Sequence, residues 1–340
     1  MSLYLVTGAA GFIGSALVHA LLERGEQVRG LDNFETGRRE NLADVLSDID
    51  FREADLLDAD AVASSCRGVD YVLHQAAIPS VPKSIADPAR SNRVNVEGTL
   101  NVLIAARDAG VTRVVYAASS SAYGDTPTLP KHEDMIPMPL SPYAVAKLAG
   151  ELYMRVFHGV YGLPTVCLRY FNIFGPRQDP TSQYSGVLAR FIPAMLRATP
   201  TSPKPGLAGD PAKSERPTIY GDGEQSRDFC YIDNAAAANL SAAAAPEGEV
   251  AGETFNIATG RRYSLNETVA LLRPLTGYTG EVEYAPERAG DIRHSLADIS
   301  RAQKKLGYQP LVDFEEGLRR TVEWYRAAEA NKQRELAASR

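Results

Sequence analysis

The chain has 340 residues, of which 44% are hydrophobic and 23% charged, and its formal net charge is −6. This balance is typical of a globular protein with one large core or two linked cores. A mildly acidic chain without a run of lysines and arginines is a poor binder of nucleic acid or of anionic membranes, so neither is expected as a partner.

The three cysteines, Cys66, Cys167 and Cys230, lie far apart in the sequence. Their spacing predicts neither a disulfide framework nor a metal site, so we expect small core residues and no metal. The N-terminal MSLYLVTG lacks the basic region of a signal peptide, and no apolar run reaches membrane-spanning length. The expected compartment is therefore the cytoplasm.

The first 170 residues alternate between short apolar runs and stretches with helical spacing. The apolar runs end in small or polar residues and cover 2–8, 26–33, 69–77, 112–120 and 164–172. Helical spacing is clearest over 13–25 and 96–110. Strands that are apolar on both faces and joined by helical crossovers predict a doubly wound parallel α/β sheet of the Rossmann type.

The second half of the chain is less regular. Residues 199–217 are dense in Pro, Gly, Ser and Lys and are expected to form a surface loop, inert rather than a lid over the ligand. Beyond this loop, short strands are expected at 217–223 and 252–260, and helices at 234–245 and about 314–328.

This change of pattern divides the chain into two expected domains. The doubly wound domain covers 1–172, with 225–247 returning to it. A smaller mixed α/β domain covers 173–224 and 248–326, and the polar tail at 327–340 is expected to be frayed. The ligand is expected to lie between the two domains.

A glycine-rich turn joins the first predicted strand to the first predicted helix. VTGAAGFIG (6–14) has the spacing G-x-x-G-x-x-G, with Gly8 for the tight turn, Gly11 for the approach of a pyrophosphate, and Gly14 for close helix packing. The helix N-terminus then presents free N–H groups to the phosphates. The flanking strand and helix, and an acid at the end of the next strand, predict a dinucleotide site.

That acid is Asp32, where a carboxylate bonds the adenosine ribose hydroxyls and repels a 2′-phosphate. NAD is therefore expected rather than NADP, although Arg38 and Arg39 follow closely and favour the opposite choice. Asp32 carries more weight, because the fold fixes its place at the strand end. Asp55 and Leu56, at the end of the third strand, are expected near the adenine.

LSPYAVAK (140–147) places Tyr143 and Lys147 on one face of a predicted helix. The strand before this helix ends in AASSSAYG (117–124), which brings hydroxyl groups to the edge where such sheets bind ligands. A lysine ammonium and the positive nicotinamide lower the pKa of a tyrosine, ordinarily about 10. We therefore expect Tyr143 to remove a hydroxyl proton while a hydride leaves for the nicotinamide.

Together these motifs resemble the extended short-chain dehydrogenase/reductases that act on nucleotide sugars, over about residues 2–325. Three stretches, 74–88, 168–180 and 226–234, are similar to the UDP-N-acetylglucosamine 4-epimerase branch. The resemblance implies a tightly bound NAD, a first domain that binds it, and a second domain that binds a UDP-sugar. It also implies a homodimer formed through the helices at 91–109 and 142–160.

The resemblance also assigns site residues by motif. The implied catalytic residues are Ser119, Tyr143 and Lys147. The implied NAD-binding residues are Gly8, Gly11, Phe12, Ile13, Gly14, Asp32, Asn33, Asp55, Leu56, Gln75, Ala76, Ala77, Asn95, Tyr143, Lys147 and Tyr170. The implied substrate-binding residues are Ser80, Ser119, Ser121, Tyr143, Asn172, Val187, Tyr220, Arg227, Arg288, Asp291 and Ser295.

Some of these assignments carry a specific role. Asn172, Arg227 and Arg288 match residues that bind the diphosphate, and the forked guanidinium of arginine suits such a group. Tyr220 matches the aromatic residue near the uracil. Tyr170 matches the residue beside the nicotinamide. Asn95 is expected to brace the region of the fifth strand, and His74 and His294 are expected to be structural.

The expected reaction is C4 epimerisation through a transient 4-keto sugar. Related dehydratases and decarboxylases carry an acidic residue in the segment that matches SSSAYG, whereas this chain has Ser119, Ser120, Ser121 and Ala122. Without a second acid/base, the expected cycle oxidises C4, turns the sugar over, and returns the hydride to the other face.

Two residues bear on the identity of the sugar. Ser295 matches a position that is tyrosine in members confined to plain hexoses, so its small side chain leaves room for a 2-acetamido group. Asp179 replaces an arginine of the uronate epimerases and would repel a uronate if it faced the sugar. UDP-GlcNAc/UDP-GalNAc is therefore the expected pair, with UDP-Glc/UDP-Gal as possible additional substrates.

Several alternatives stay open from the sequence alone. Three of them concern the substrate: UDP-glucose only, UDP-glucuronate, or a UDP-N-acetylhexosaminuronate. Further alternatives are a decarboxylase, a dehydratase or a net oxidoreductase of the same fold, and a non-catalytic NAD-binding sensor.

Overall fold

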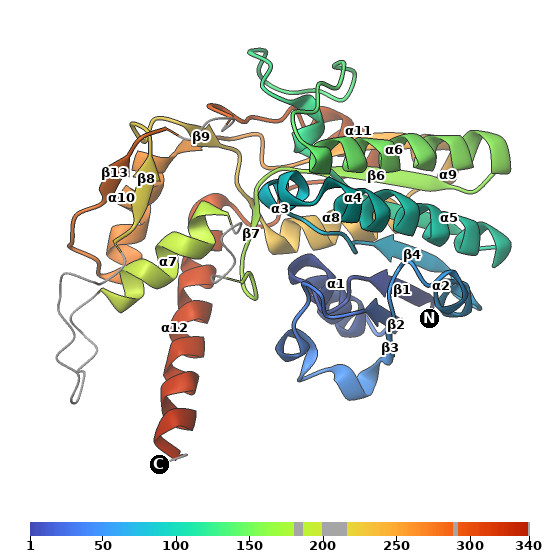
Figure 1. Ribbon diagram of the computed structural model, residues 1–340, viewed down its shortest axis with the longest axis horizontal. Helices are drawn as coiled ribbons and strands as arrows, with labels where there is room; N and C mark the ends of the chain where they lie inside the picture. The colour runs from blue at the N-terminus through green and yellow to red at the C-terminus, as the bar shows by residue number, and fades with distance from the viewer. Residues whose placement is uncertain (180–185, 199–215, 288–291, 339–340) are drawn as a thin grey trace.

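The computed structural model describes residues 1–179, 186–198, 216–287 and 292–338. Its main sheet has seven parallel strands in the order β11-β6-β5-β4-β1-β2-β3 (Figure 1). The strands are β1 (Leu3–Thr7), β2 (Gln27–Asp32), β3 (Asp50–Glu53), β4 (Tyr71–His74), β5 (Arg113–Ser119), β6 (Thr165–Tyr170) and β11 (Glu253–Ile257). The order reverses between β1 and β4, and such a reversal opens a crevice at the carboxyl ends of the strands.

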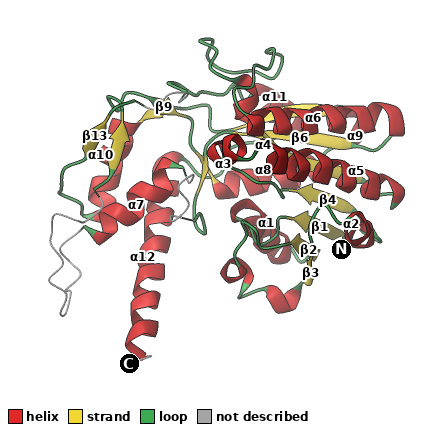
Figure 2. Cartoon of the chain, in the orientation of Figure 1, coloured by secondary structure: helices red, strands yellow, loops and turns green. Residues whose placement is uncertain are grey.

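Helices cover both faces of this sheet, as Figure 2 shows. One face packs against α1 (Phe12–Glu23), α8 (Ile232–Ala244) and α11 (Ser300–Leu306), and the other against α2 (Ala59–Cys66), α5 (Gly98–Asp108) and α6 (Pro142–Tyr161). Within β1, Tyr4 and Val6 belong to the first core and Leu5 to the second, so successive side chains serve opposite layers. The predicted doubly wound fold is confirmed.

A helical run precedes α5 and frames the crevice. It comprises α3 (Val81–Ala86), α4 (Pro88–Asn92) and a π-helical turn, η3 (Arg93–Glu97), which continues directly into α5. The shorter elements of the first half are the 3₁₀ turns η1 (Arg39–Leu42), η2 (Leu46–Asp48) and η4 (Ser120–Tyr123).

The expected domain boundary at residue 248 separates segments that the structure places together. β11 pairs in register with β6 at the edge of the main sheet, and α11 packs beside β11. Phe255 and Ile257 point to the same face of this strand and are fully buried in the first core. Assigning 248–326 entirely to a second domain was therefore wrong for β11 and α11.

The remaining elements form a smaller region beside the sheet (Figure 1). They are β7 (Ile173–Phe174), α7 (Val187–Arg197), β8 (Thr218–Tyr220), β9 (Ser226–Arg227), β10 (Cys230–Tyr231), β12 (Tyr263–Ser264), α10 (Leu265–Thr276), β13 (Glu283–Ala285) and α12 (Phe314–Ala338). The short helix α9 (Glu247–Val250) lies instead beside α11, and its Val250 belongs to the core of the main sheet. The core of the smaller region is rich in aromatic rings, among which Phe229 and Phe314 stack at 4.8 Å. The loop expected at 199–217 lies almost wholly outside the described residues.

The C-terminal helix α12 extends ten residues further than the sequence pattern indicated. It ends at Ala338, whereas we expected an end near 328 and a frayed tail from 327. The physical reason is composition, because Glu, Ala, Lys, Gln and Arg are strong helix formers even without an apolar face. No helix in the described part of the chain is long and apolar enough to span a membrane.

One buried carboxylate ties the smaller region to the sheet. Asp228 follows β9 and accepts hydrogen bonds from Thr259 N–H (2.9 Å), Gly260 N–H (3.1 Å) and Ala297 N–H (3.2 Å). Its own carbonyl accepts from Nδ2 of Asn172 at 3.0 Å. Burial raises the pKa of Asp228 to about 6. This residue therefore fixes four separate stretches of chain where the sheet meets the smaller region.

Candidate active site

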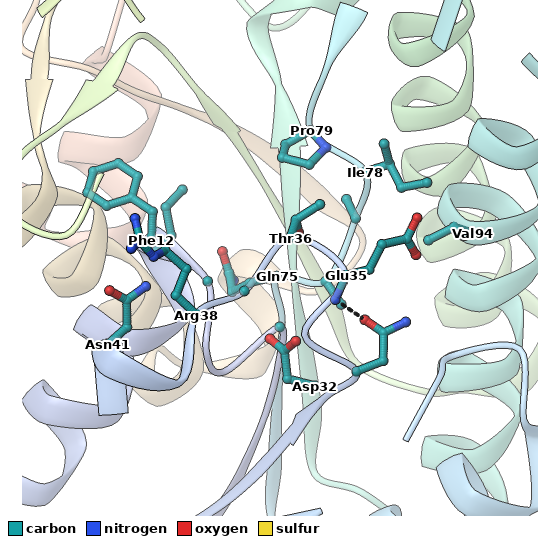
Figure 3. A pocket seen from close by; sticks show the side chains of 18 of the residues that line it. Phe12, Asp32, Glu35, Thr36, Arg38, Asn41, Gln75, Ile78, Pro79 and Val94 are labelled. Carbon is teal, nitrogen blue, oxygen red and sulfur yellow. Dashed lines mark hydrogen bonds between the residues drawn. The ribbon is translucent and has the colours of Figure 1, made fainter. Parts of the chain in front are cut away.

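A cavity of about 720 Å³ opens at the carboxyl ends of the strands, where the strand order reverses (Figure 3). Its walls come from the turn after β1, the ends of β2 and β3, and the loop that leads from β4 to α3. Residues 177–179, which follow β7, close another side. The cavity therefore lies between the sheet and the smaller region, where the sequence analysis expected the ligand.

The glycine turn has the geometry of a phosphate cradle. Gly8 has φ +69°, and a Cβ there would lie 2.8 Å from the backbone of Ala76. A Cβ on Gly14 would lie 1.9 Å from the carbonyl oxygen of Gly8. Gly11 is the N-cap of α1, and no side chain among the described residues caps that helix or places an acid in its first turn. The open helix N-terminus favours an anion such as a diphosphate.

Asp32 ends β2 at the wall of the cavity (Figure 3). Its carboxylate accepts the N–H of Ala10 at 3.0 Å and the N–H of Phe34 at 2.7 Å. Burial raises the pKa of Asp32, and these backbone hydrogen bonds oppose that shift. A carboxylate has about four acceptor positions, so these bonds do not exhaust its capacity to accept from the ribose hydroxyls of a dinucleotide. Its charge disfavours a 2′-phosphate.

The two arginines after Asp32 are engaged with carboxylates. Arg39 donates to Glu53 at 2.6 Å and lies over the ring of Phe34 at 3.9 Å. Arg38 donates to Asp179 at 3.4 Å, across the cavity. The structure therefore gives these arginines partners other than a 2′-phosphate, which agrees with the choice of NAD from Asp32.

The same contact corrects the interpretation of Asp179. The sequence analysis used Asp179 against a uronate on the condition that it faced the sugar. It lies instead in the wall of the cavity that contains the glycine turn, opposite Arg38. Because Asp179 is paired with Arg38, its charge no longer argues against a uronate substrate.

Most of the expected cofactor residues line this cavity. They are Gly8, Gly11, Phe12, Ile13, Gly14, Asp32, Asn33, Asp55, Leu56, Gln75, Ala76 and Ala77. Ser80, expected at the sugar, lines the same cavity and caps α3 by accepting the N–H of Lys83 at 3.1 Å. The amide of Asn33 donates to Asp55 at 3.0 Å, which joins the ends of β2 and β3. These contacts place the residues together, while their bonds to NAD stay a prediction.

Sequence reasoning missed several residues of the lining, among them Thr36, Gly37 and Arg177. Gly37 carries a recognisable physical signal, because a Cβ there would lie 2.8 Å from both carboxylate oxygens of Asp32. The turn after β2 therefore needs a glycine to close over the acid. In the sequence, the only sign of this requirement is the position of Gly37, five residues after Asp32.

The expected role of Asn95 was wrong in its location. Asn95 lies in the π-helical turn η3, where its Oδ1 accepts the N–H of Ile78 at 2.8 Å and its Nδ2 donates to the carbonyl of Ile78 at 3.3 Å. It therefore braces the loop after β4 rather than the fifth strand. His74, between Thr7 (2.7 Å) and Thr99 (3.0 Å), is a buried structural residue, and burial lowers its pKa to about 3.

The three expected catalytic residues converge at the end of β5 and the start of α6. Ser119 is the last residue of β5, and its Oγ accepts from the N–H (3.2 Å) and the hydroxyl (2.9 Å) of Ser121. Tyr143 is the second residue of α6, which begins after the N-cap Ser141. Burial raises the pKa of Tyr143, and its hydrogen bond with the Ser119 side chain opposes that shift. The serine and the tyrosine therefore face one another.

Lys147 lies one turn further along α6 and is 3% exposed. Its Nζ donates to the carbonyl of Ala117 at 2.8 Å and lies 4.8 Å from the centre of the Tyr116 ring. Burial lowers the pKa of Lys147 to about 8, and the charge of Glu151 opposes this shift. The ammonium is thus held in place and is charged at neutral pH, as a group that stabilises a phenolate must be.

Ser84 is a further contact to the catalytic helix that no sequence spacing indicated. This fully buried residue of α3 accepts the backbone N–H of Tyr143 at 3.0 Å and donates to the carbonyl of Val81 at 2.6 Å. The bond connects the helix that borders the cavity to the helix that carries the tyrosine.

The expected sugar-side residues gather in the smaller region. Nδ2 of Asn172 lies 3.5 Å from Oγ of Ser295, and Arg227 donates to the carbonyls of Ser226 (3.0 Å) and Arg293 (3.1 Å). Tyr220 ends β8 and Val187 begins α7. Arg288 and Asp291 lie outside the described residues. His294 bonds Ser226 at 2.9 Å, which is a structural contact.

The described residues contain no cluster of three or more His, Cys, Asp or Glu that could hold a metal ion, and all three cysteines are buried and free. The donors around the cavity suit an organic dinucleotide instead. An uncapped helix end meets its phosphates, glycine backbone allows close approach, and a carboxylate meets its ribose.

The parallel doubly wound sheet, the glycine cradle and the Ser–Tyr–Lys set define a class of dinucleotide-binding enzymes that transfer hydride. Residues 4–258 match the NAD dependent epimerase/dehydratase family, and the chain belongs to this family. The resemblance expected from the motifs is confirmed, and NAD is the cofactor.

Three relatives illustrate the range of the family around this chain. It is 39% identical to the UDP-glucose 4-epimerase of Mycolicibacterium smegmatis over 326 residues, which is 95% of this chain and 98% of that protein. The UDP-N-acetylglucosamine 4-epimerase from Methanobrevibacter ruminantium M1, in complex with UDP-N-acetylmuramic acid, matches with a TM-score of 0.87 at 39% identity, over 96% of this chain and 99% of that one. The UDP-glucuronic acid 4-epimerase from Bacillus cereus, in complex with UDP-glucuronic acid and NAD, matches with a TM-score of 0.84 at 31% identity and the same coverage.

The crowding at Gly14 predicts that Gly14→Ala weakens both folding and cofactor retention. The added methyl group forces α1 away from the turn after β1, at a cost of about 1–3 kcal/mol or more. We expect a lower Tm and a smaller fraction of purified protein that carries NAD, measured by thermal denaturation and by enzymatic assay of released NAD. Gly248→Ala is the control, because a Cβ there meets nothing within 4 Å. Equal NAD content in both variants would contradict the role of this contact.

Proposed function

We propose that the protein catalyses the NAD-dependent C4 epimerisation of a UDP-hexose, with UDP-GlcNAc and UDP-GalNAc as the preferred pair. The observation that carries the proposal is the arrangement of Ser119, Tyr143 and Lys147 at the end of β5 and the start of α6, on the carboxyl edge of the sheet where the cavity of the glycine turn also opens. The segment 119–124 supplies hydroxyl groups and no carboxylate. This set can move a proton with a hydride and lacks the additional acid of an elimination.

NAD, when bound, supplies a hydride acceptor for the sugar carbon. The chain supplies the proton transfer and the orientation. Ser119 holds the C4 oxygen in line with Tyr143, whose phenolate takes the hydroxyl proton. Lys147 stabilises that phenolate. Its ammonium donates a hydrogen bond to the carbonyl of Ala117, which fixes the position of the charge. After the 4-keto sugar turns over, Tyr143 returns the proton to the same oxygen, so the protein ends the cycle unchanged.

The small size of Ser295 supports the choice of a 2-acetamido sugar. Its Oγ lies beside Asn172, which follows β6 directly and thus lies near the strand that carries Tyr170. A small residue there leaves space next to the sugar ring. UDP-glucuronate is the main alternative, because the charge of Asp179 is paired with Arg38.

We expect Tyr143→Phe to lower kcat by about 10³-fold, the usual contribution of a positioned acid/base. Loss of one hydroxyl group leaves the cavity of the glycine turn intact, so NAD content stays at the wild-type level. The measurement is the interconversion of UDP-GlcNAc and UDP-GalNAc resolved by chromatography. Tyr161→Phe on the same helix, half exposed and remote from Ser119, is the matched control. Wild-type turnover by Tyr143→Phe would refute the mechanism.

The substrate is tested by offering UDP-GlcNAc, UDP-Glc and UDP-GlcA separately. We expect kcat/KM to be highest for UDP-GlcNAc, and Ser295→Tyr to lower it at least about tenfold relative to UDP-Glc, as a steric loss of 1–3 kcal/mol implies. Ser300→Tyr, at an exposed position at the start of α11, is the control for a new tyrosine. Reaction of UDP-GlcA alone would replace the proposed substrate, and NADH release with turnover would replace the proposed reaction.

We also propose that the enzyme is a homodimer formed through α5 and α6. Four apolar side chains of α6 are largely exposed: Val145 (52%), Leu152 (57%), Val156 (48%) and Val160 (69%). Their spacing places them along one side of the helix, and α5 and α3 lie beside α6 with Ile104 and Ile85 exposed (Figure 1). A contiguous apolar patch of this kind is typical of a protein–protein interface.

Val156→Glu is expected to convert the dimer to a monomer at micromolar concentration, because it buries a charge at the centre of the apolar patch. Sedimentation velocity measures the mass of the wild-type and variant proteins. Leu311→Glu is the control, since Leu311 is 70% exposed and lies outside the patch. A wild-type protein that sediments as a monomer would remove the proposal.

A further inference from the structure

A closed ring of hydrogen bonds joins the cofactor cavity to helix α8. The hydroxyl of Tyr170 donates to Oε1 of Gln75 at 3.1 Å. Nε2 of Gln75 donates to Oδ1 of Asn239 at 3.1 Å, and Nδ2 of Asn239 donates to the hydroxyl of Tyr170 at 2.7 Å. Gln75 lines the cavity, whereas Asn239 is fully buried on α8, 164 residues away in the sequence.

The direction of every bond in this ring follows from one backbone carbonyl. Nδ2 of Asn239 also donates to the carbonyl of Ala235 at 2.7 Å, and a carbonyl can only accept. The other amide atom of Asn239, Oδ1, must then face Gln75 as an acceptor. Gln75 in turn must present Nε2 to Asn239 and Oε1 to Tyr170, so the Tyr170 hydroxyl has to donate to Gln75.

We propose that Asn239 is a positioning residue for the bound NAD, acting through Gln75. It fixes the carboxamide of Gln75 in a single orientation at the cavity wall, with one N–H and one lone pair unused by the ring. Any hydrogen bond from Gln75 to the dinucleotide is made by these two groups. The inference deepens the proposed function, since it rests on the same cofactor cavity.

The hydrogen-bond ring also distinguishes Tyr170 from Tyr143. Tyr170 pairs in register with Ser119 on the neighbouring strand, while its hydroxyl is engaged by Gln75 and Asn239. That hydroxyl both accepts from Asn239 and donates to Gln75, and burial raises its pKa further above the ordinary value. Tyr170 makes these bonds as a neutral hydroxyl, whereas Tyr143 faces Ser119.

The test is a double-mutant cycle on the rate of NAD release, which requires no sugar substrate. Purified protein with its bound NAD is diluted, and the NAD set free is followed over time by an enzymatic cycling assay. We expect Asn239→Ala and Gln75→Ala each to accelerate release at least about tenfold, as loss of an oriented hydrogen bond implies. We expect the double variant to release NAD within about twofold of Gln75→Ala alone.

Asn234→Ala is the matched control for a merely structural effect. Asn234 is also fully buried on α8, but it holds the backbone of Leu311 and Val312 and does not contact the ring. It should lower the Tm as Asn239→Ala does, while NAD release stays within about twofold of wild type. If Asn239→Ala does not fold, Tyr170→Phe breaks the same ring by removing one oxygen and should give the same acceleration.

Wild-type release from Asn239→Ala, or effects of Asn239→Ala and Gln75→Ala that multiply in the double variant, would overturn the proposal. These outcomes are separable from the fate of the proposed function. If the protein shows the coupling but epimerises no UDP-sugar, the role of Asn239 is supported and the proposed epimerase activity is refuted. If the protein epimerises a UDP-sugar but shows no coupling, the proposed epimerase activity is supported and the role of Asn239 is refuted.

Discussion

The site depends on how closely α1 approaches the turn after β1. Backbone alone fills the space between Gly8 and Gly14, so the first N–H groups of α1 reach the edge of the sheet. The same packing holds Ala10 against Asp32 and places α8, which packs beside α1, against β5 and β6. The glycine cradle, the place of Asp32 and the helix that carries Asn239 therefore all depend on one contact.

A second constraint is the burial of charge around the catalytic lysine. Glu151, one turn beyond Lys147 on α6, forms a two-pronged pair with Arg169 of β6, with the shortest bond at 2.7 Å and both side chains 5% exposed. Such a pair is costly to break, because removing one partner leaves an uncompensated buried charge. It holds α6 against β6, so the helix with Tyr143 and the strand with Tyr170 keep a fixed relation.

Local sequence was sufficient for the parts of the site that lie within one strand–turn–helix unit. The glycine turn, Asp32, Ser119 and the Tyr143–Lys147 pair were all predicted, because each follows from a spacing of a few residues. Long-range partners were not. Ser84 meets Tyr143 across 59 residues and Asp179 meets Arg38 across 141, and no periodicity connects positions so far apart. β11 was misplaced for the same reason, since only its pairing with β6 assigns it to the sheet.

The strand order also fixes a length. Asp32 ends β2 and Ser119 ends β5, and two strands, β1 and β4, separate them. Three spacings of about 4.8 Å place the two strand ends about 14 Å apart. A ligand that touches both Asp32 and Ser119 must therefore be extended. A molecule that carries only the adenosine half can contact Asp32 without reaching Ser119. The strand order thus favours a ligand long enough to span this distance, as a complete dinucleotide is.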